Sequence, residues 1–307
     1  MDFIEIKDVV KDYGKHRALD HVSMNIPEGC IYGLLGPNGA GKTSLIRIIN
    51  QITKPDSGEI LLNGVPMKPE DVRDMGYLPE ERGLYKKMKV ADQIMYLAQL
   101  KGMPRKEVEA EMKVWLERFE LTDWRNKKIE ALSKGMAQKV QFIATVIHRP
   151  KLLIFDEPFS GFDPVNAEIL KREILRLREN GSTIIFSTHN MGSVEEVCEQ
   201  ISLINHSKVV LQGDVNKVRH HFKKHIYAVT VREGVLLPEP GMFTLEPDET
   251  HRPGDTSTYI RLNSGVNVKD VIACLNDRYE LTGFHEILPS MHEVFIFNTS
   301  RGQIPLL

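Results

Sequence analysis

The chain has 307 residues, of which 41% are hydrophobic and 27% are charged, a balance typical of a globular protein with one large or two medium domains. The formal net charge is −2, so no basic excess marks a nucleic-acid footprint, and we expect no nucleic-acid partner. Three widely spaced cysteines fit neither a disulfide framework nor a zinc site. Reduced thiols are therefore expected.

The chain shows no targeting or membrane segment. Its first residues, Met-Asp-Phe-Ile-Glu-Ile-Lys, do not have the pattern of a secretory signal, and no run approaches the ~18 apolar residues of a membrane span. We expect a cytoplasmic protein that acts at a membrane only through a partner.

The N-terminal third mixes strands with a single short helix. Apolar or alternating runs predict strands at 3–6, 18–26, 30–35 and 59–64, the last closed by an Asn-Gly turn, and a buried helix at 44–49. Strands that cluster on both sides of the helix indicate a small antiparallel sheet beside a main sheet.

From about residue 90 the apolar spacing becomes helical and stays so to about residue 148, with helices expected at 91–100 and 105–119. Wholly apolar strands at 152–155, 183–187 and 201–204 then indicate a buried parallel sheet. Helices are expected at 167–179 and 194–198. Residues 208–213 are expected to form an edge strand in a hairpin with the strand at 201–204.

The composition changes after Asp214. Residues 216–226 are rich in Lys, Arg and His, and 234–255 in Pro, Glu and Gly. Strands at 227–231, 256–262 and 279–284, a helix at 268–276 and a last segment at 291–297 predict a separate α+β domain over 216–307. Its function stays open between dimerisation, ligand sensing and a structural cap. His220–His225 are expected to lie in a solvated linker helix.

One stretch carries a specific chemical signal. Residues 36–43 read Gly-Pro-Asn-Gly-Ala-Gly-Lys-Thr, the phosphate-loop pattern, between a strand and a helix. The glycines let main-chain N–H groups converge on an anion, and the helix directs its positive end to the same point. Lys42 is expected at the β- and γ-phosphates, and the Thr43 hydroxyl at Mg²⁺.

Further candidates follow along the chain. The apolar strand 152–155 ends in Asp156 and Glu157, which suit Mg²⁺ binding and water activation, although a plain polar turn has the same composition. Ser133 begins a helix, where it either caps it or helps bind an anion. His189 follows a parallel strand, at the edge where ligands bind. Tyr13 is placed to stack on a base or simply to lie on the surface.

Together these stretches resemble the nucleotide-binding domain of ABC ATPases over about residues 1–215. The order is phosphate loop, Gly-Tyr-Leu-Pro-Glu at 76–80, Leu-Ser-x-Gly at 132–135, Asp-Glu-Pro at 156–158, Ser-Gly-x-Asp-Pro at 160–164 and Ser-Thr-His at 187–189. The implied fold is α/β, a P-loop NTPase core with an antiparallel β subdomain and a helical insert at about 90–148. A small C-terminal α+β accessory domain at 216–307 completes it.

The resemblance also implies residue roles. Tyr13 would stack on adenine, Glu80 would contact Mg²⁺, Asp156 would bind Mg²⁺, Glu157 would be the catalytic base and His189 the switch histidine. Asp163 would lie at a dimer interface, and Ser133 and Gly135 would close on the ATP of the other subunit. The nucleotide phosphates and Mg²⁺ would be bound by Gly36, Pro37, Asn38, Gly39, Ala40, Gly41, Lys42, Thr43 and Ser44.

Two positions depart from the family pattern. Lys134 and Met136 replace a glycine and the glutamine of the usual Leu-Ser-Gly-Gly-Gln, while Ser133 and Gly135 are kept. We expect closure to survive and Lys134 to be solvated. Glu80 replaces a glutamine; its carboxylate can still ligate Mg²⁺, but it adds repulsion beside a γ-phosphate.

The implied function is the ATP-binding and ATP-hydrolysing subunit of an ABC transporter. Residues 76–85 and the C-terminal domain resemble the sodium-efflux and ABC-2-type exporter subset, which exports sodium, drugs or peptides. The expected cofactors are ATP and Mg²⁺. The expected partners are a second ATPase subunit, identical or different, and a membrane permease that docks near residues 77–90. The protein would then lie on the inner face of the cell membrane.

Two other classes were weighed. A soluble ABC ATPase that acts on ribosomes or DNA carries two cassettes or a long coiled coil, and this chain has neither. A GTPase needs Asn-Lys-x-Asp, whereas residues 126–129 read Asn-Lys-Lys-Ile; a P-loop kinase would leave 132–135 and His189 unexplained.

Overall fold

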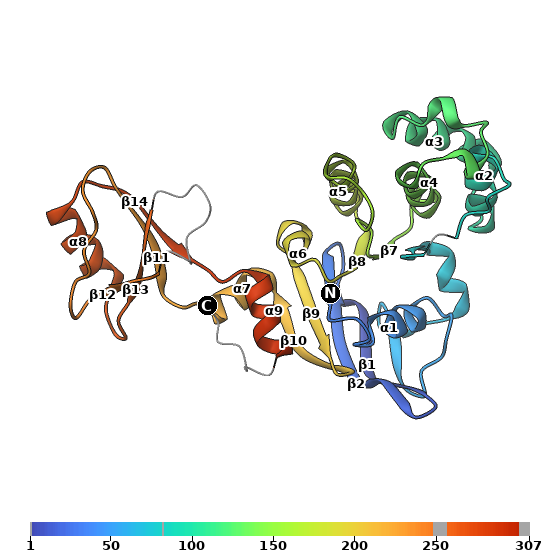
Figure 1. Ribbon diagram of the computed structural model, residues 1–307. Coiled ribbons are helices and arrows are strands. Elements are labelled where there is room, and N and C mark those ends of the chain that lie inside the picture. The colour runs from blue at the N-terminus through green and yellow to red at the C-terminus, as the bar shows by residue number, and fades with distance from the viewer. Residues whose placement is uncertain (1, 82, 248–256, 301–307) are drawn as a thin grey trace. The chain divides into compact units, whose positions relative to one another are not determined.

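The computed structural model describes residues 2–81, 83–247 and 257–300 and divides into two compact units, 1–215 and 216–307 (Figure 1). Arg82 and Thr256, the first residue of the strand expected at 256–262, lie outside the described residues. Within the described ranges, no helix combines the length and the hydropathy needed to cross a bilayer.

The first unit contains the small antiparallel sheet that the sequence predicts. Its order is β2-β1-β4-β5, from β1 (Asp2–Tyr13), β2 (His16–Pro27), β4 (Ser57–Leu62) and β5 (Val65–Pro66). Asn63 and Gly64 form the turn between β4 and β5, both with positive φ (51° and 76°), as a tight hairpin requires.

The main sheet has the order β10-β9-β3-β8-β7-β6. Neighbouring strands pair in parallel except at β10, which is antiparallel to β9. The strands are β3 (Ile31–Leu35), β6 (Met75–Leu78), β7 (Leu152–Asp156), β8 (Thr183–Thr188), β9 (Gln200–Asn205) and β10 (Lys208–Asp214). This sheet confirms the predicted α/β core.

Residues 76–80 correct an expectation. No strand is expected there from the sequence, but Gly76–Leu78 belong to β6, the edge strand beside β7. The four-residue strand is too short for alternation to show, and it contains a glycine. Gly76 fits because a Cβ there would lie only 2.5 Å from the Thr145 carbonyl oxygen of the packed helix α4.

The helical insert forms a group of helices beside the main sheet, with α4 packed on β6 (Figure 1). It contains α2 (Val90–Leu100), α3 (Arg105–Arg118) and α4 (Lys134–Val146), close to the expected bounds. Aromatic rings join it to the main sheet: Phe119 and Phe142 have centroids 5.7 Å apart, and Phe142 and Phe155 5.5 Å. Burial of such rings is the main stabilising contact between the insert and β7.

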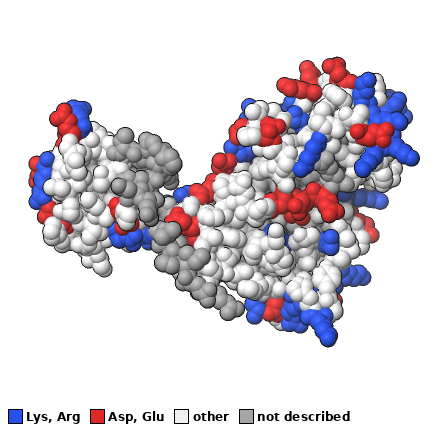
Figure 2. Space-filling model, viewed as in Figure 1, with Lys and Arg blue, Asp and Glu red and all other residues white. Residues whose placement is uncertain are grey.

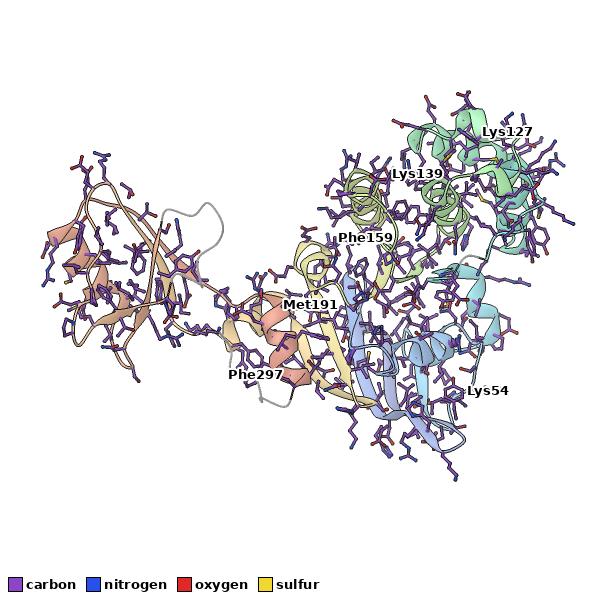
Figure 3. The ribbon with its side chains drawn as sticks, in the orientation of Figure 1. Lys54, Lys127, Lys139, Phe159, Met191 and Phe297 are labelled. Carbon is purple, nitrogen blue, oxygen red and sulfur yellow. The ribbon has the colours of Figure 1, made fainter. Side chains whose placement is uncertain are left out.

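The remaining helices of the first unit follow its main-sheet strands: α1 (Lys42–Ile49), α5 (Pro164–Glu179) and α6 (Met191–Val197). Three short 3₁₀ turns lie at Pro69–Asp74, Thr122–Trp124 and Ile129–Ala131. Beyond β7, the Phe159 ring (Figure 3) contacts Phe186 of β8 with centroids 5.4 Å apart, which fixes the start of the chain segment that leads to α5.

The second unit is an α+β domain with its own core. Its sheet has the order β12-β13-β11-β14, and Tyr227, Val229, Ile260 and Leu275 are among its buried residues. The strands are β11 (Ile226–Val231), β12 (Phe243–Leu245), β13 (Thr258–Leu262) and β14 (Leu281–Ile287), and the helices are α7 (Val215–His221), α8 (Val268–Arg278) and α9 (Met291–Thr299). The strand expected at 279–284 begins two residues later, because Tyr279 is the C-cap of α8.

The prediction that residues 220–225 form a solvated linker helix is only partly right. Residues up to His221 are helical, but Lys224 is not solvated: its side chain is 7% exposed and forms an ion pair with Glu293 at 3.0 Å. Phe222 packs on Phe297 (labelled in Figure 3), with ring centroids 5.6 Å apart. This basic stretch is therefore part of the second unit's packing.

Candidate functional site

Strand register brings the predicted catalytic residues to one edge of the main sheet. Leu35 of β3 pairs with Thr188 of β8, and Asp156 of β7 pairs with Ser187. The phosphate loop, Glu157 and His189 directly follow these pairs. They therefore share the carboxyl edge of a parallel sheet, where ligands bind in open α/β folds.

Two glycines shape the phosphate loop, because any side chain in their place would force the neighbouring backbone to move. Gly36 and Gly41 have φ of 151° and 115°. A Cβ at Gly36 would overlap the Ile204 carbonyl oxygen, and one at Gly41 would overlap the Ala18 carbonyl oxygen. The loop backbone thus packs directly on β9 and β2, with space for glycine alone.

The loop presents donors suited to phosphate. Helix α1 begins without a side-chain cap and without an acidic residue in its first turn, so its N–H groups are available to an anion. Lys42 is 8% exposed, and its ammonium donates to the carbonyl oxygens of Gly36 (2.6 Å) and Pro37 (3.2 Å). The ammonium is thereby held over the loop, where a phosphate would meet it.

Lys42 and the carboxylates influence one another. Burial lowers the pKa of Lys42, while Glu157, Asp156 and Glu80 oppose that shift. Burial raises the pKa of Asp156, which is 5% exposed, and the charges of Glu157 and Glu80 raise it further. A bound cation would relieve this repulsion, so the site fits a metal together with phosphate.

A cavity surrounds the loop and gathers most of the predicted residues. Glu80, Asp156 and Glu157 line it with Tyr13 and five residues of the loop and helix α1, namely Asn38, Gly39, Lys42, Thr43 and Ser44. Gly41, also predicted, lines it as well. His16 and Ala18 line it too, although neither is predicted from the sequence. In Figure 2 acidic side chains gather on the face between the insert and the sheets.

Tyr13 lies beside the phosphate loop. It ends β1, is 43% exposed, and lines the loop cavity, while the Lys11 ammonium lies 5.5 Å from its ring centroid. An exposed ring of this kind offers a face to a base. His16 and Ala18 could have been predicted as neighbours of Tyr13, because the short turn after Tyr13 brings β2 back antiparallel beside it.

Glu157 is the most constrained carboxylate of the site. Its φ is 50°, a left-handed value uncommon for this residue type, and its N–H donates to the Ser187 carbonyl oxygen at 2.9 Å. Its carboxylate accepts from Thr188 Oγ1 at 3.0 Å and from the His189 N–H at 2.8 Å. The His189 ring Nδ1 lies 2.6 Å away. Strain of this kind is typical of functional positions.

Glu80 is positioned from α4. The Gln141 amide donates to the carbonyl oxygens of Pro79 (3.5 Å) and Glu81 (3.4 Å), on either side of Glu80.

Thr43, Asp156 and Glu80 offer one hydroxyl and two carboxylates, which suits Mg²⁺ whose coordination is completed by phosphate oxygens and water. Among the described residues, no three His, Cys, Asp or Glu side chains alone form a metal site.

Ser133, Gly135 and Asp163 are not brought to the loop of their own chain, since none of them lines its cavity. Ser133 caps α4, accepting from the Met136 N–H at 3.3 Å, and Asp163 caps α5, accepting from the Asn166 N–H at 3.0 Å. Lys134 is exposed, as expected, and its side-chain end fills the space where Gly161 would carry a Cβ.

Comparisons with known proteins identify the family of the chain. The family described as ABC transporter matches residues 19–160, and the ATP-binding protein DrrA1-3-like C-terminal domain matches residues 213–299. The uncharacterised ABC transporter ATP-binding protein YhaQ of Bacillus subtilis (strain 168) is 41% identical, with 95% of this chain and 97% of that protein covered.

A named relative and a solved structure give two further similarities. The linearmycin resistance ATP-binding protein LnrL of Bacillus subtilis (strain 168) is 32% identical over 68% of each chain. A solved ATP-binding subunit of an ABC transporter has a TM-score of 0.68 and 29% identity, covering 72% of this chain and 93% of that one. The chain therefore belongs to the ABC transporter ATP-binding proteins, and its N-terminal unit has the fold of their ATPase cassette.

Proposed function

We propose that the chain is the ATP-hydrolysing subunit of an ABC exporter and that it drives a separately encoded membrane permease. The observation that carries the hydrolytic part is the contact of Glu157 with His189 beside the phosphate loop. A carboxylate held by three hydrogen-bond donors or acceptors at the γ-phosphate position is suited to orient and deprotonate water.

Most of the predicted site residues have a part in this proposal. Lys42 and the loop N–H groups bind the phosphates, and Tyr13 stacks on the base. Thr43, Asp156 and Glu80 would hold Mg²⁺, which would supply positive charge to offset that of the phosphates. Glu157 accepts the proton of the attacking water, and His189 orients the carboxylate and contacts the γ-phosphate.

The cavity is completed by a second subunit in this proposal. Ser133 and Gly135 lie at the start of α4, which exposes N–H groups, yet they do not reach the loop of their own chain. Two chains arranged head to tail would bring them to the partner's ATP, with Asp163 at the interface. We favour a homodimer; a related second ATPase subunit would use the same contacts.

A groove offers a docking place for the permease. It has a volume of about 330 Å³ and runs between the insert and β6, with Tyr77, Leu84, Leu97 and Leu100 among its lining residues. Ile52 and Leu100 in this groove are 59% and 61% exposed. Exposed apolar side chains close to Glu80 in the chain are suited to bind a cytoplasmic segment of a permease. Such binding would place the protein on the inner face of the membrane.

The exporter assignment is supported by the named relative that confers linearmycin resistance and by the resemblance of residues 76–85 to export ATPases. Sodium, drugs and peptides are the candidate substrate classes. Co-purification with the permease and an efflux assay test this part. Failure of the chain to stimulate export in membranes that contain its permease would contradict it.

The hydrolytic proposal is tested by Glu157→Gln. This variant keeps the size and one acceptor of the side chain but not its basicity, so ATP turnover should fall by a factor of about 10² or more. ATP binding should persist. Turnover at the wild-type rate would show that the base is wrongly assigned.

A further inference from the structure

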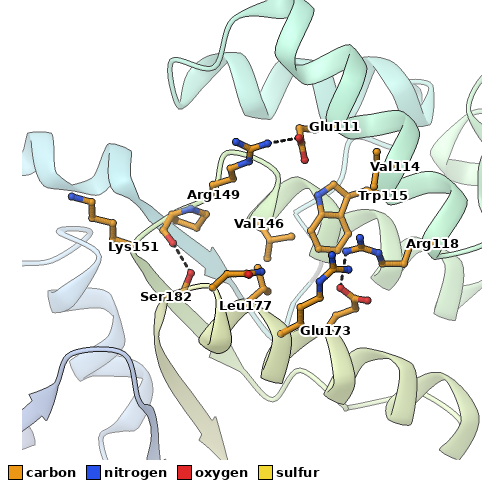
Figure 4. A pocket seen from close by; sticks show the side chains of 14 residues that line it. Glu111, Val114, Trp115, Arg118, Val146, Arg149, Lys151, Glu173, Leu177 and Ser182 are labelled. Carbon is orange, nitrogen blue, oxygen red and sulfur yellow. Dashed lines mark hydrogen bonds and ion pairs between the residues drawn. The ribbon is translucent and has the colours of Figure 1, made fainter.

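A second cavity, of about 470 Å³, lies where the helical insert meets the rest of the first unit (Figure 4). Its walls come from α3 and α5. Lys151 and Ser182, which precede β7 and β8, also line it. The cavity therefore lies at the amino ends of the strands whose carboxyl ends carry Glu157 and His189, and it is separate from the loop cavity.

Two ion pairs border this cavity. Arg118 of α3 contacts Glu173 of α5 at 2.9 Å, and the pair is mostly buried, with side chains 24% and 12% exposed. Arg149 forms an ion pair with Glu111. Since both carboxylates of the lining are already matched by a guanidinium, neither leaves an uncompensated negative charge in the cavity.

Arg176 supplies a positive charge that is not matched. It lines the cavity from the last turn of α5, and among the described residues it has no carboxylate within ion-pair distance. Lys151 contributes less, because Figure 4 shows its ammonium directed away from Trp115 and from both ion pairs. The net charge offered to a ligand is therefore positive and centred on α5.

Apolar side chains form the wall between the ion pairs. Figure 4 shows Trp115, Val146 and Leu177 gathered there. Trp115 is held rigidly: the Arg118 guanidinium lies 4.8 Å from its ring centroid, and Phe119 stacks on it at 6.0 Å. These contacts hold the indole in place, so its small exposed surface is a fixed apolar wall.

We propose that this cavity binds a small organic anion, with its acidic group on Arg176 and its apolar body against Trp115, Val146 and Leu177. The volume lies within the ~300–1,000 Å³ of small-molecule sites. Its lining combines an apolar wall with two matched ion pairs and the unmatched Arg176. A ligand there would contact the insert and α5 together. The inference does not depend on ATP hydrolysis.

The test uses anilinonaphthalene sulfonate, an organic anion with an aromatic body, and its neutral analogue N-phenylnaphthylamine. The full chain with Trp124→Phe leaves Trp115 as the remaining tryptophan, so quenching of its fluorescence reports binding at this wall. Arg176→Gln removes the proposed anchor. Arg172→Gln is the matched control, because Arg172 is exposed on the same helix but does not line the cavity.

We expect the sulfonate to quench Trp115 with an affinity about tenfold above that of the neutral analogue, as one charged hydrogen bond allows. Arg176→Gln should abolish this difference, while Arg172→Gln and Arg176→Lys should largely keep it. Equal affinities for the two probes, equal affinities in the two glutamine variants, or no quenching by the sulfonate would overturn the proposal. None of these outcomes depends on whether the chain hydrolyses ATP.

Discussion

Glu157 and His189 contact each other twice, through the main-chain N–H of His189 at 2.8 Å and through its ring Nδ1 at 2.6 Å. The residues are 32 positions apart and follow neighbouring strands β7 and β8. The carboxylate is largely buried, whereas the ring is 63% exposed. The geometry fixes the carboxylate and leaves the ring exposed.

His189→Ala should lower the rate of ATP turnover at least tenfold with little change in KM, because the main-chain contact to Glu157 remains while the ring contact is lost. Steady-state kinetics measure both quantities. His21→Ala is the control, since it removes an exposed histidine that also contacts a carboxylate, Asp8, at 2.8 Å. Equal loss in both variants would contradict a specific part for His189.

Gly36→Ala should abolish nucleotide binding, because its Cβ would overlap the Ile204 carbonyl oxygen in addition to the strain of a positive φ. Gly39→Ala lies in the same loop at φ 79° but meets no atom within 4 Å. It should cost only the conformational strain, about 1–2 kcal/mol. Titration with a fluorescent nucleotide compares them, and equal losses would mean that packing on β9 is unimportant.

His148 should make stability depend on pH. Burial lowers its pKa to about 4, against 6.5 in an unfolded chain, and its Nε2 lies 3.2 Å from the Met75 carbonyl oxygen. The unfolded state binds the proton first, so stability is lost as pH falls below about 6.5 and the loss is complete near pH 4. Between pH 7 and pH 5 this amounts to about 2 kcal/mol.

Denaturant unfolding at the two pH values checks the His148 contribution. His148→Gln keeps a donor for Met75 but cannot take up a proton, so the variant should lose about 2 kcal/mol less than the wild type on acidification. The same pH dependence in both proteins would assign the effect to other groups.

Leu100→Asp should remove stimulation of ATP turnover by the permease and leave the basal rate unchanged, because Leu100 lines the groove beside Tyr77 and not the loop cavity. Val65→Asp is the control: Val65 is 55% exposed on β5 and lies outside the groove. Turnover measured with and without permease separates the two. Loss of stimulation in both variants would argue against this docking place.

A fragment of residues 1–215 should fold and bind ATP, because the two units have separate buried clusters, one around Leu45 and Ile154 and the other around Ile260 and Val271. Thermal unfolding and nucleotide titration test the fragment. Comparing its dimerisation with that of the full chain then shows whether residues 216–307 contribute to the contact between subunits. A fragment that does not fold would show that the first unit needs the second for its stability.

Much of the core was predictable because its signals are local. The phosphate loop is contiguous, and strands such as 152–155 are apolar throughout, so the sequence alone indicates both. Strands β6 and β12 were missed because each has three or four residues, next to turns or in a stretch rich in Pro and Glu. Whether a short segment forms a strand depends more on the strands it pairs with than on its own sequence pattern.

Contacts between distant residues could not be read from the sequence. The order Asp-Glu-Pro then Ser-Thr-His predicts that Glu157 and His189 share an edge, but not that two hydrogen bonds join them. The Arg118–Glu173 pair joins residues 55 positions apart, and each residue alone reads as a solvated helix charge. Only the packing of α3 against α5 shows that they border a cavity.

The central claim is that Ser133 and Gly135 complete the phosphate-loop site of a second chain. Sedimentation of the Glu157→Gln protein with and without MgATP tests it most directly. We predict that MgATP converts this slow variant to a dimer and that adding Ser133→Arg prevents the conversion while each chain still binds ATP. An ATP-bound Glu157→Gln protein that stays monomeric, or that dimerises equally well with Ser133→Arg, would contradict the claim.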